Sequence, residues 1–499
     1  MNPAATPAYT EPHRLQVHFS PPSSWMNDPN GMVYAQGEYH LFYQYHPGST
    51  VWGPMHWGHA VSRDLLHWEH LPVALEPDAL GAIFSGSAVA DPDNRSGLGD
   101  GHTPPLVAFF TYHDAEGERA GRSDYQTQGL AYSRDAGRTW IKYPGNPVLP
   151  NRAGIRDFRD PKVFWHAPAG QWIMALAAGD RVQFFQSPNL LQWAFTGEFG
   201  AGYGSHGGVW ECPDLFPLPV DGGPEERWVL LLSINPGGPN GGSATQYFTG
   251  HFDGQTFICD GPPEQVRWMD YGPDNYAGVT WSEVPDGRRL LMAWMSNWDY
   301  GQQVPTSPWR SAMTLPRVLS LRRIGGEVLL CNAFPEELAA LRADPQPLQT
   351  ALLAREDFAA LPLPYPAAPA ELELSFGLET ADAHPVLRLS SPEGHQVLIG
   401  YDAARGELYI DRSCAGPADF SAKYPGIARA PYRAGAVLRL HAVLDTGSVE
   451  LLADGGAVSL TALYFAGAPL TQLSAGMLAG QGRMLEGSAW RLRSIWQAG

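Results

Sequence analysis

The chain has 499 residues, of which 44% are hydrophobic and 17% are charged, so two or three domains with sizeable cores are expected. Its formal net charge of −18 disfavours nucleic acid and anionic membranes as partners, because both repel a negative surface. No apolar run approaches the ~18 residues that a membrane-spanning helix needs. The composition therefore indicates a globular protein with neither of these partners.

The N-terminal segment and the cysteines bear on the cellular compartment. Residues 1–14 contain no apolar stretch of the kind that a secretory signal peptide requires. The four cysteines, at positions 212, 259, 331 and 414, are far apart and form no Cys-x-x-Cys motif. We therefore expect a cytoplasmic protein with reduced cysteines. A secreted protein whose leader had been removed would have the same sequence.

A repeat organises the first two thirds of the chain. An Asp-Pro or Pro-Asp step recurs about every 60 residues, at Asp28, Asp91, Asp160 and Asp214. Between these steps, a Ser-x-Asp/Asn segment that ends in Trp recurs at 62–68, 133–140 and 187–193. Helical periodicity is nearly absent, whereas β-branched and aromatic residues are interrupted by Gly, Pro and Asp. Five such units over residues ~15–330 predict a five-bladed β-propeller, and the alternative is a large sandwich or jelly roll.

The last third has a different pattern. A short helical stretch at 336–341 is followed by strict alternation of apolar and polar residues, for example at 372–376 and 437–443. This alternation is typical of a β-sandwich. The predicted chain is thus all-β, with a propeller catalytic domain over residues 1–335, a short helical linker over 336–350 and a β-sandwich domain over 351–499.

Three of the repeated acidic segments have features of a ligand site. Asp-Pro most often forms a simple turn, and Asp91 fits that interpretation. By contrast, Asp28, Asp160 and Glu211 follow closely after Trp25, Phe158 and Trp210, respectively. Because the innermost strands of a propeller reach the mouth of its central channel, these carboxylates are expected in one axial pocket. Among aromatic side chains, one acid can stay protonated and another ionised, which cleavage of a glycosidic bond requires.

The same segments resemble those of glycoside hydrolase family 32, the β-fructofuranosidases, which include invertases, levanases and exo-inulinases. The resemblance covers nearly the whole chain and involves residues 25–31 (WMNDPNG), 84–87 (FSGS), 158–162 (FRDPK), 210–214 (WECPD), 296–298 (SNW), 305–306 (PT), 309–310 (WR), 411–413 (DRS) and 448–450 (SVE). It implies a five-bladed propeller followed by a β-sandwich, which agrees with the repeat count.

Carried over position by position, the resemblance also implies roles for individual residues. Asp28 would be the nucleophile, Glu211 the general acid/base, and Asp160 the acid that stabilises the transition state by binding fructose hydroxyls. Further substrate contacts are implied for Asn27, Gln44, Trp52, Phe84, Ser85, Arg159 and Trp298. A retaining mechanism would place the nucleophile and the acid/base ~5–5.5 Å apart. We expect hydrogen bonds, for example from Asn27, to keep Asp28 ionised. No metal and no organic cofactor is implied.

The sequence therefore predicts a retaining exo-β-fructosidase that releases terminal fructose from sucrose, inulin or levan-type chains through a covalent fructosyl-enzyme. The block at 294–317 resembles levanases and exo-inulinases more than sucrose-6-phosphate hydrolases. Three alternatives stay open: an invertase restricted to sucrose, an inverting arabinanase-like glycosidase of a related five-bladed family, and a carbohydrate-binding protein without catalysis. The predicted partner is the sugar or fructan substrate. Nothing in the sequence decides between a monomer and a homodimer.

Overall fold

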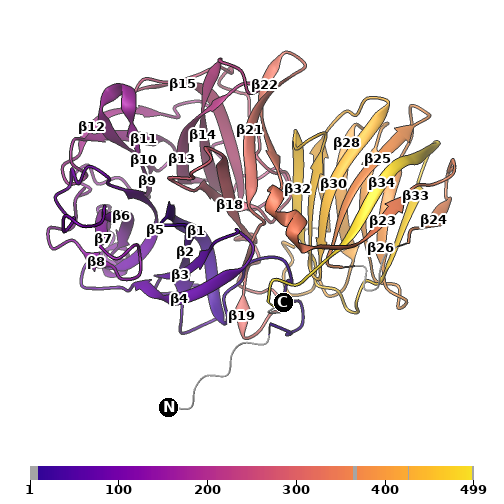
Figure 1. Cartoon of the computed structure of the whole chain (residues 1–499), viewed down its shortest axis with the longest axis horizontal. Helices are drawn as coiled ribbons and strands as arrows, with labels where there is room; N and C mark the ends of the chain where they lie inside the picture. Colours follow the sequence, from indigo (N-terminus) through magenta and orange to yellow (C-terminus); the bar gives the residue numbers. More distant parts are fainter. Residues whose placement is uncertain (1–8, 363–367, 425, 497–499) are drawn as a thin grey trace.

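The computed structural model describes residues 9–362, 368–424 and 426–496, and two β-rich domains lie side by side in it (Figure 1). The N-terminal domain consists of five sheets, each starting from an innermost strand and continuing outward with antiparallel neighbours. The prediction of a five-bladed propeller is therefore confirmed. No helix among the described residues is long and apolar enough to cross a bilayer.

The first three blades follow the order of the chain. The first contains β1 (Ser24–Ala35), β2 (Glu38–His46), β3 (His56–Ser62) and β4 (Trp68–Leu75). The second contains β5 (Ala82–Ala90), β6 (Leu106–His113), β7 (Gln126–Ser133) and β8 (Ile141–Lys142), with α1 (Ala115–Arg119) between β6 and β7. The third contains β9 (Phe158–His166), β10 (Gln171–Ala178), β11 (Val182–Ser187) and β12 (Ala194–Phe199), with the 3₁₀ turn η1 (Ala167–Ala169) between β9 and β10.

The last two blades complete the ring. The fourth contains β13 (Val209–Pro219), β14 (Glu226–Asn235), β15 (Ala244–Phe252) and β16 (Phe257–Cys259). The fifth contains β17 (Tyr276–Thr280), β18 (Arg289–Met295), β20 (Ala312–Met313), β21 (Arg317–Ile324) and β22 (Glu327–Ala333). Between β18 and β20, the short strand β19 (Trp309–Arg310) pairs in parallel with β1 of the first blade. This pairing ties the end of the propeller to its beginning.

Buried apolar side chains hold the blades together in pairs. One cluster, with Phe42 and Phe110, lies between the first and second blades, and another, with Phe109 and Met174, lies between the second and third. Further clusters join the remaining neighbours around the ring. Because the blades pack through these faces, the innermost strands are held around a common axis, where their polar side chains meet.

The C-terminal domain is a sandwich of two sheets. One sheet has the order β23 (Arg342–Leu348), β34 (Gly482–Leu492), β25 (Ala370–Leu378), β30 (Val437–Asp445), β31 (Ser448–Ala453) and β32 (Val458–Leu463). The other has the order β24 (Phe358–Ala360), β33 (Gln472–Met477), β26 (Pro385–Ser390), β27 (Gln396–Asp402), β28 (Glu407–Cys414) and β29 (Ile427–Pro431). Alternate side chains of both sheets form one apolar core, as the sequence alternation predicts.

The segment predicted as a helical linker over 336–350 differs in its second half. Its first half is the 3₁₀ helix η2 (Glu336–Leu341), but Arg342–Leu348 forms β23, which pairs with β34 at the edge of the sandwich. Leu338 and Leu341 of η2 are buried between the two domains. Polar composition and two prolines conceal this strand in the sequence, because an edge strand pairs on one side only and tolerates proline.

Candidate active site

All ten residues that the sequence analysis singled out line one cavity of about 290 Å³ at the mouth of the propeller channel. These are Asn27, Asp28, Gln44, Trp52, Phe84, Ser85, Arg159, Asp160, Glu211 and Trp298. Most of them come from innermost strands: Asp28 from β1, Ser85 from β5, Asp160 from β9 and Glu211 from β13. The fold therefore collects side chains that are far apart in the sequence.

A bulge interrupts the pairing of every innermost strand at this cavity. The register shifts between Met26 and Pro29 in β1, and between Glu211 and Asp214 in β13. Corresponding shifts occur in β5, β9 and β17. Asp160 and Cys212 have positive φ angles of 67° and 46°, which few non-glycine residues adopt. Because a bulge re-aims side chains and leaves backbone groups unpaired, it explains how acidic residues of several strands point into one cavity.

The prolines of the acidic segments fit the same geometry. Pro161 and Pro213 lie within the interrupted part of an innermost strand, and Pro29 lies at the end of the corresponding interruption in β1, where pairing with Tyr43 resumes. Proline has no N–H to donate and is tolerated in strands at bulges. The Asp-Pro steps that sequence statistics assign to turns are thus the bulges of innermost strands at the cavity.

Asp28 is held by two side-chain hydrogen bonds. Asn27 Nδ2 donates to Asp28 Oδ1 at 3.0 Å, and Ser85 Oγ donates to Asp28 Oδ2 at 2.7 Å. The expected bond from Asn27 is therefore present, and Ser85 supplies a second one. Burial and the negative charge of Glu211 raise the pKa of Asp28, whereas the bonds from Ser85 and Asn27 act in the opposite direction. The two donors thus counteract the effect of burial on the carboxylate.

Glu211 is fixed by an arginine and a tyrosine. Arg159 Nη2 and Nε donate to Glu211 Oε1 at 2.9 and 3.2 Å, and the Tyr276 hydroxyl donates to Oε2. Arg159 is itself held by Asp157 Oδ1, 2.7 Å from Nη1. Both oxygens of Glu211 thus have a donor, and the carboxyl group has one orientation in the cavity.

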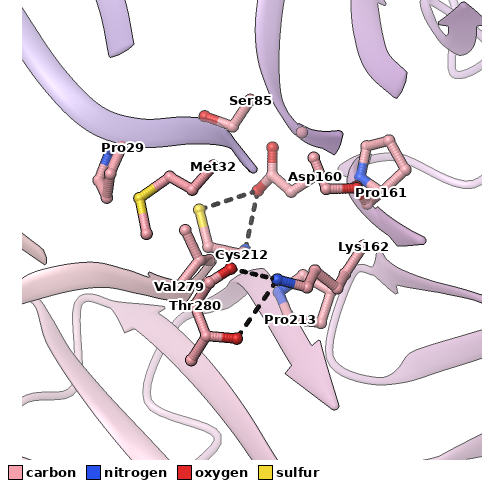
Figure 2. A pocket seen from close by; sticks show the side chains of 12 residues that line it. Pro29, Met32, Ser85, Asp160, Pro161, Lys162, Cys212, Pro213, Val279 and Thr280 are labelled. Atoms are coloured by element: carbon pink, nitrogen blue, oxygen red, sulfur yellow. Dashed lines mark hydrogen bonds between the residues drawn. The ribbon is translucent and has the colours of Figure 1, made fainter. Parts of the chain in front are cut away.

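Asp160 lines the same cavity as these two acids. Its Oδ2 accepts a hydrogen bond from the backbone N–H of Cys212 at 3.0 Å (Figure 2). The Cys212 thiol lies 3.6 Å from this oxygen and 3.7 Å from Asp28 Oδ2. Burial raises the pKa of Asp160 to about 7; Arg159 opposes this shift, and the charges of Glu211 and Asp28 add to it. Three acids thus share one cavity, where they cannot all be charged without repulsion.

Below the acids, a buried lysine joins three blades. Lys162 of β9 donates to the backbone oxygen of Thr280 in β17 at 2.7 Å, and Figure 2 shows this bond beneath Cys212. The Lys162 ammonium also lies 3.0 Å from Asp214 Oδ2 of β13. The ion pair offsets the cost of burying either charge alone. It anchors β9 and β13 just beyond the bulges that aim Asp160 and Glu211.

The sequence analysis did not single out several residues of the cavity. His113, Glu118, Tyr125, Gln126 and Asp157 also line it. None of them lies in a repeated acidic segment, so no local signal points to them. Cys212 was inside the quoted segment 210–214 and could have been found there. Tyr276 has no such signal, because its hydrogen bond to Glu211 joins strands of two different blades.

Comparison with known proteins places this chain in a family. Residues 18–332 match the N-terminal domain of glycosyl hydrolases family 32, and residues 337–490 match the C-terminal domain of that family. The chain belongs to glycosyl hydrolase family 32. It is 47% identical to a levanase of Bacillus subtilis over 466 residues, which cover 91% of this chain and 66% of the levanase.

Solved structures agree with this assignment. The crystal structure of exo-inulinase from Aspergillus awamori is similar with a TM-score of 0.90 and 35% identity, and the match covers 98% of this chain and 100% of that one. A β-fructofuranosidase from Schwanniomyces occidentalis, complexed with fructosyl-erythritol, is similar with a TM-score of 0.89 and 32% identity, over 97% of this chain and 99% of that one. The family match disfavours the arabinanase-like alternative, which would belong to a different family.

Proposed function

We propose that this protein is a retaining exo-β-fructosidase that hydrolyses terminal β-fructofuranosides of sucrose, fructo-oligosaccharides and fructans. The observation that carries the proposal is the meeting of Asp28, Asp160 and Glu211 in one cavity at the end of the propeller channel. A levanase and an exo-inulinase among the relatives support fructans as the substrate class.

The proposed mechanism begins with an attack by Asp28. Its carboxylate, oriented by Asn27 and Ser85, attacks the anomeric carbon of the terminal fructosyl unit while Glu211 protonates the leaving oxygen. Glu211 then removes a proton from a water molecule as the water oxygen attacks the anomeric carbon. The bond between this carbon and Asp28 breaks, so fructose is released and the Asp28 carboxylate is restored. Retention follows because two displacements occur at the same carbon.

In the proposed mechanism, Asp160 and Arg159 bind and orient groups at the reaction centre but neither donate nor accept the proton that is transferred. Asp160 accepts hydrogen bonds from fructose hydroxyls as positive charge develops on the ring, and its own position is fixed by the Cys212 amide. Arg159 holds Glu211 and presents further donors to the sugar. Trp298, packed against Trp294 with ring centroids 5.0 Å apart, forms a wall of the cavity.

Release of fructose and glucose from equal masses of sucrose, short inulin oligomers, inulin and levan tests this function. Asp28→Asn and Glu211→Gln serve as inactive controls. Fructose from the polymers without intermediate oligomers, with both variants nearly inactive, is the expected result. Activity on sucrose alone would make the protein an invertase. Release of fructose from none of the four would refute the proposal and would revive the binding-protein alternative.

A further inference from the structure

A second cavity lies at the opposite end of the innermost strands from the candidate active site. Its volume is about 370 Å³, within the range of ~300–1,000 Å³ that is typical of small-molecule sites. In β9, Asp160 lines the active-site cavity and Trp165 lines the second one, and the strand between them spans about 16 Å. In β5, Ser85 and Ala90 are divided in the same way. No described residue lines both cavities, so this far-end cavity is separate from the active site.

Aromatic side chains of the third blade form one wall of the far-end cavity. Phe164 and Trp165 are neighbours in β9, and Trp172 of β10 pairs with Trp165 across the sheet. The rings of Trp165 and Trp172 meet edge to face, with centroids 5.2 Å apart. Phe164 and Trp165 are only partly buried. Partly exposed aromatic rings around a hollow are the kind of surface on which the C–H faces of sugar rings pack.

The same wall contains a buried hydrogen-bond donor that lacks an acceptor. Trp172 is 3% exposed, and its indole Nε1 has no hydrogen-bond partner among the described residues. A buried N–H without an acceptor is unfavourable, because it has lost its bond to water and gained no other. A hydroxyl oxygen of a ligand in the cavity would supply the missing acceptor.

Two charged side chains of the fifth blade line the same cavity. The Glu283 carboxylate is exposed and has neither a hydrogen bond nor an ion pair with the described residues. Arg289 forms no ion pair with them either, and its Nη1 lies 3.5 Å from the Thr280 hydroxyl and from the Trp281 backbone oxygen. Glu283 thus offers acceptors and Arg289 offers donors, which are the groups that bind the hydroxyls of a sugar.

The loop after β5 bears on the charge of the ligand. It contributes Asp91, Asp93 and Arg95 to the cavity. Asp91 accepts a bond from the Arg95 backbone N–H at 2.9 Å, and the Arg95 side chain is paired with Asp93 at 3.0 Å. Together with Glu283 and Arg289, the cavity holds three acids and two arginines. It therefore has no excess of positive charge that would attract a phosphate or a carboxylate, and a neutral ligand with hydroxyl groups fits it best.

We propose that the far-end cavity is a second saccharide-binding site, which takes a neutral mono- or disaccharide and has no part in bond cleavage. A sugar ring packs on Phe164 and Trp165, and its hydroxyls bind Trp172 Nε1, Glu283 and Arg289. The inference goes beyond the proposed function, because binding at this end of the propeller requires none of the three active-site acids.

Equilibrium dialysis of the whole Asp28→Asn protein with radiolabelled sucrose tests the proposal. Two sucrose molecules are expected per chain, one at each end of the propeller. Glu283→Ala removes an acceptor and should weaken one of the two sites about tenfold without altering the other. Inorganic phosphate should not displace sucrose from the weakened site. The matched control is Glu264→Ala, at another exposed glutamate of a turn.

Pro92→Trp gives a second test, because Pro92 is exposed and lines the far-end cavity but not the active-site cavity. The added ring should block the same site, and kcat/KM for sucrose of the variant with Asp28 intact should stay within a factor of two. If neither variant weakens sucrose binding, or if phosphate displaces the sucrose, the proposal is overturned. A wild-type protein that is inactive on all fructosides would refute only the proposed function, since the second site is identified by the variants that weaken it.

Discussion

Two groups of carboxylates in this molecule, one in the active-site cavity and one at the interface between the domains, differ in the charges that surround them. In the active-site cavity, Asp28, Asp160 and Glu211 have one cation among the described residues, Arg159, beside them, and burial and the charges of the neighbouring acids raise the pKa values of Asp28 and Asp160. At the interface between the propeller and the sandwich, Asp445 and Glu450 flank the fully buried His18. There the two acids form ion pairs with His18, and Glu450 also forms one with Arg317.

The interface network has a partner for each charge. His18 Nδ1 lies 2.7 Å from Asp445 Oδ2, and His18 Nε2 lies 2.7 Å from Glu450 Oε1. Arg317 of β21 donates to Glu450 as well. Although burial opposes ionisation, Arg317 and His18 lower the pKa of Glu450 to about 2. Burial alone therefore does not decide whether an acid is charged. At the interface, cations stabilise the charged form of Glu450, which serves the structure. In the cavity, neighbouring acids destabilise the charged forms of Asp28 and Asp160, which serves catalysis.

The largest expected effect is on activity. Asp28→Asn should lower kcat by about 10⁴-fold or more, because the amide cannot attack the sugar. The same change should raise the melting temperature, since it removes a buried carboxylate whose ionisation the cavity disfavours. Steady-state kinetics and thermal unfolding measure the two effects. A drop in melting temperature would mean that Asp28 is a structural residue.

The corresponding change at the interface should have the reverse outcome. Glu450→Gln should destabilise the protein by about 3–5 kcal/mol, because His18 and Arg317 lose a buried counter-charge. The kcat of the folded variant at 25 °C should stay within a factor of two. Chemical unfolding measures the loss. Glu264→Gln, at an exposed glutamate without an ion pair in the described residues, is the control; equal stability of both variants would contradict the prediction.

The interface also predicts how stability depends on pH. Burial disfavours the charged ring, but hydrogen bonds to Asp445 and Glu450 raise the pKa of His18 from 6.5 to about 9. A raised folded-state pKa gives stability that is fully present below pH 6.5 and is lost as the pH rises through about 9. The melting temperature should therefore decrease as the pH rises from 6.5 to about 9. In His18→Gln this part of the slope should disappear; an unchanged slope would exclude His18 as its source.

Loss of the hydrogen bond from Ser85 to Asp28 is expected to have a smaller effect than the changes above. In Ser85→Ala, Asp28 loses a hydrogen bond that favours its ionised form, so its pKa should rise further. The acidic limb of the kcat/KM profile should then move to higher pH. Ser87→Ala is the matched control, since the Ser87 hydroxyl donates to the Pro161 backbone oxygen and not to Asp28. A shift of the same size in both variants would contradict the assignment.

The three acids could be predicted because they lie in short segments that repeat, whereas the other predicted residues of the site followed from the family resemblance. The Asp-Pro step and the neighbouring aromatic residue identify Asp28 and Asp160 as candidates without any structure, and the repeat length predicts the blades. Tyr276 and His113 were not predicted, because they contact residues of the site that are far from them in the sequence. Tyr276 of the fifth blade reaches Glu211 of the neighbouring fourth blade, and His113 stacks on Phe84 from the neighbouring strand. Neither contact has a local pattern.

The all-β architecture, the five blades and the sandwich follow from the periodicity of the sequence, and the repeated acidic segments mark Asp28, Asp160 and Glu211. The roles of these acids and the seven substrate contacts followed only from the resemblance to glycoside hydrolase family 32. The tertiary structure was needed to show which charged groups lie next to each carboxylate. It also decided that β23 belongs to the sandwich. The physical reason is that charge interactions, edge pairing and cavities depend on distances between strands that are remote in the chain.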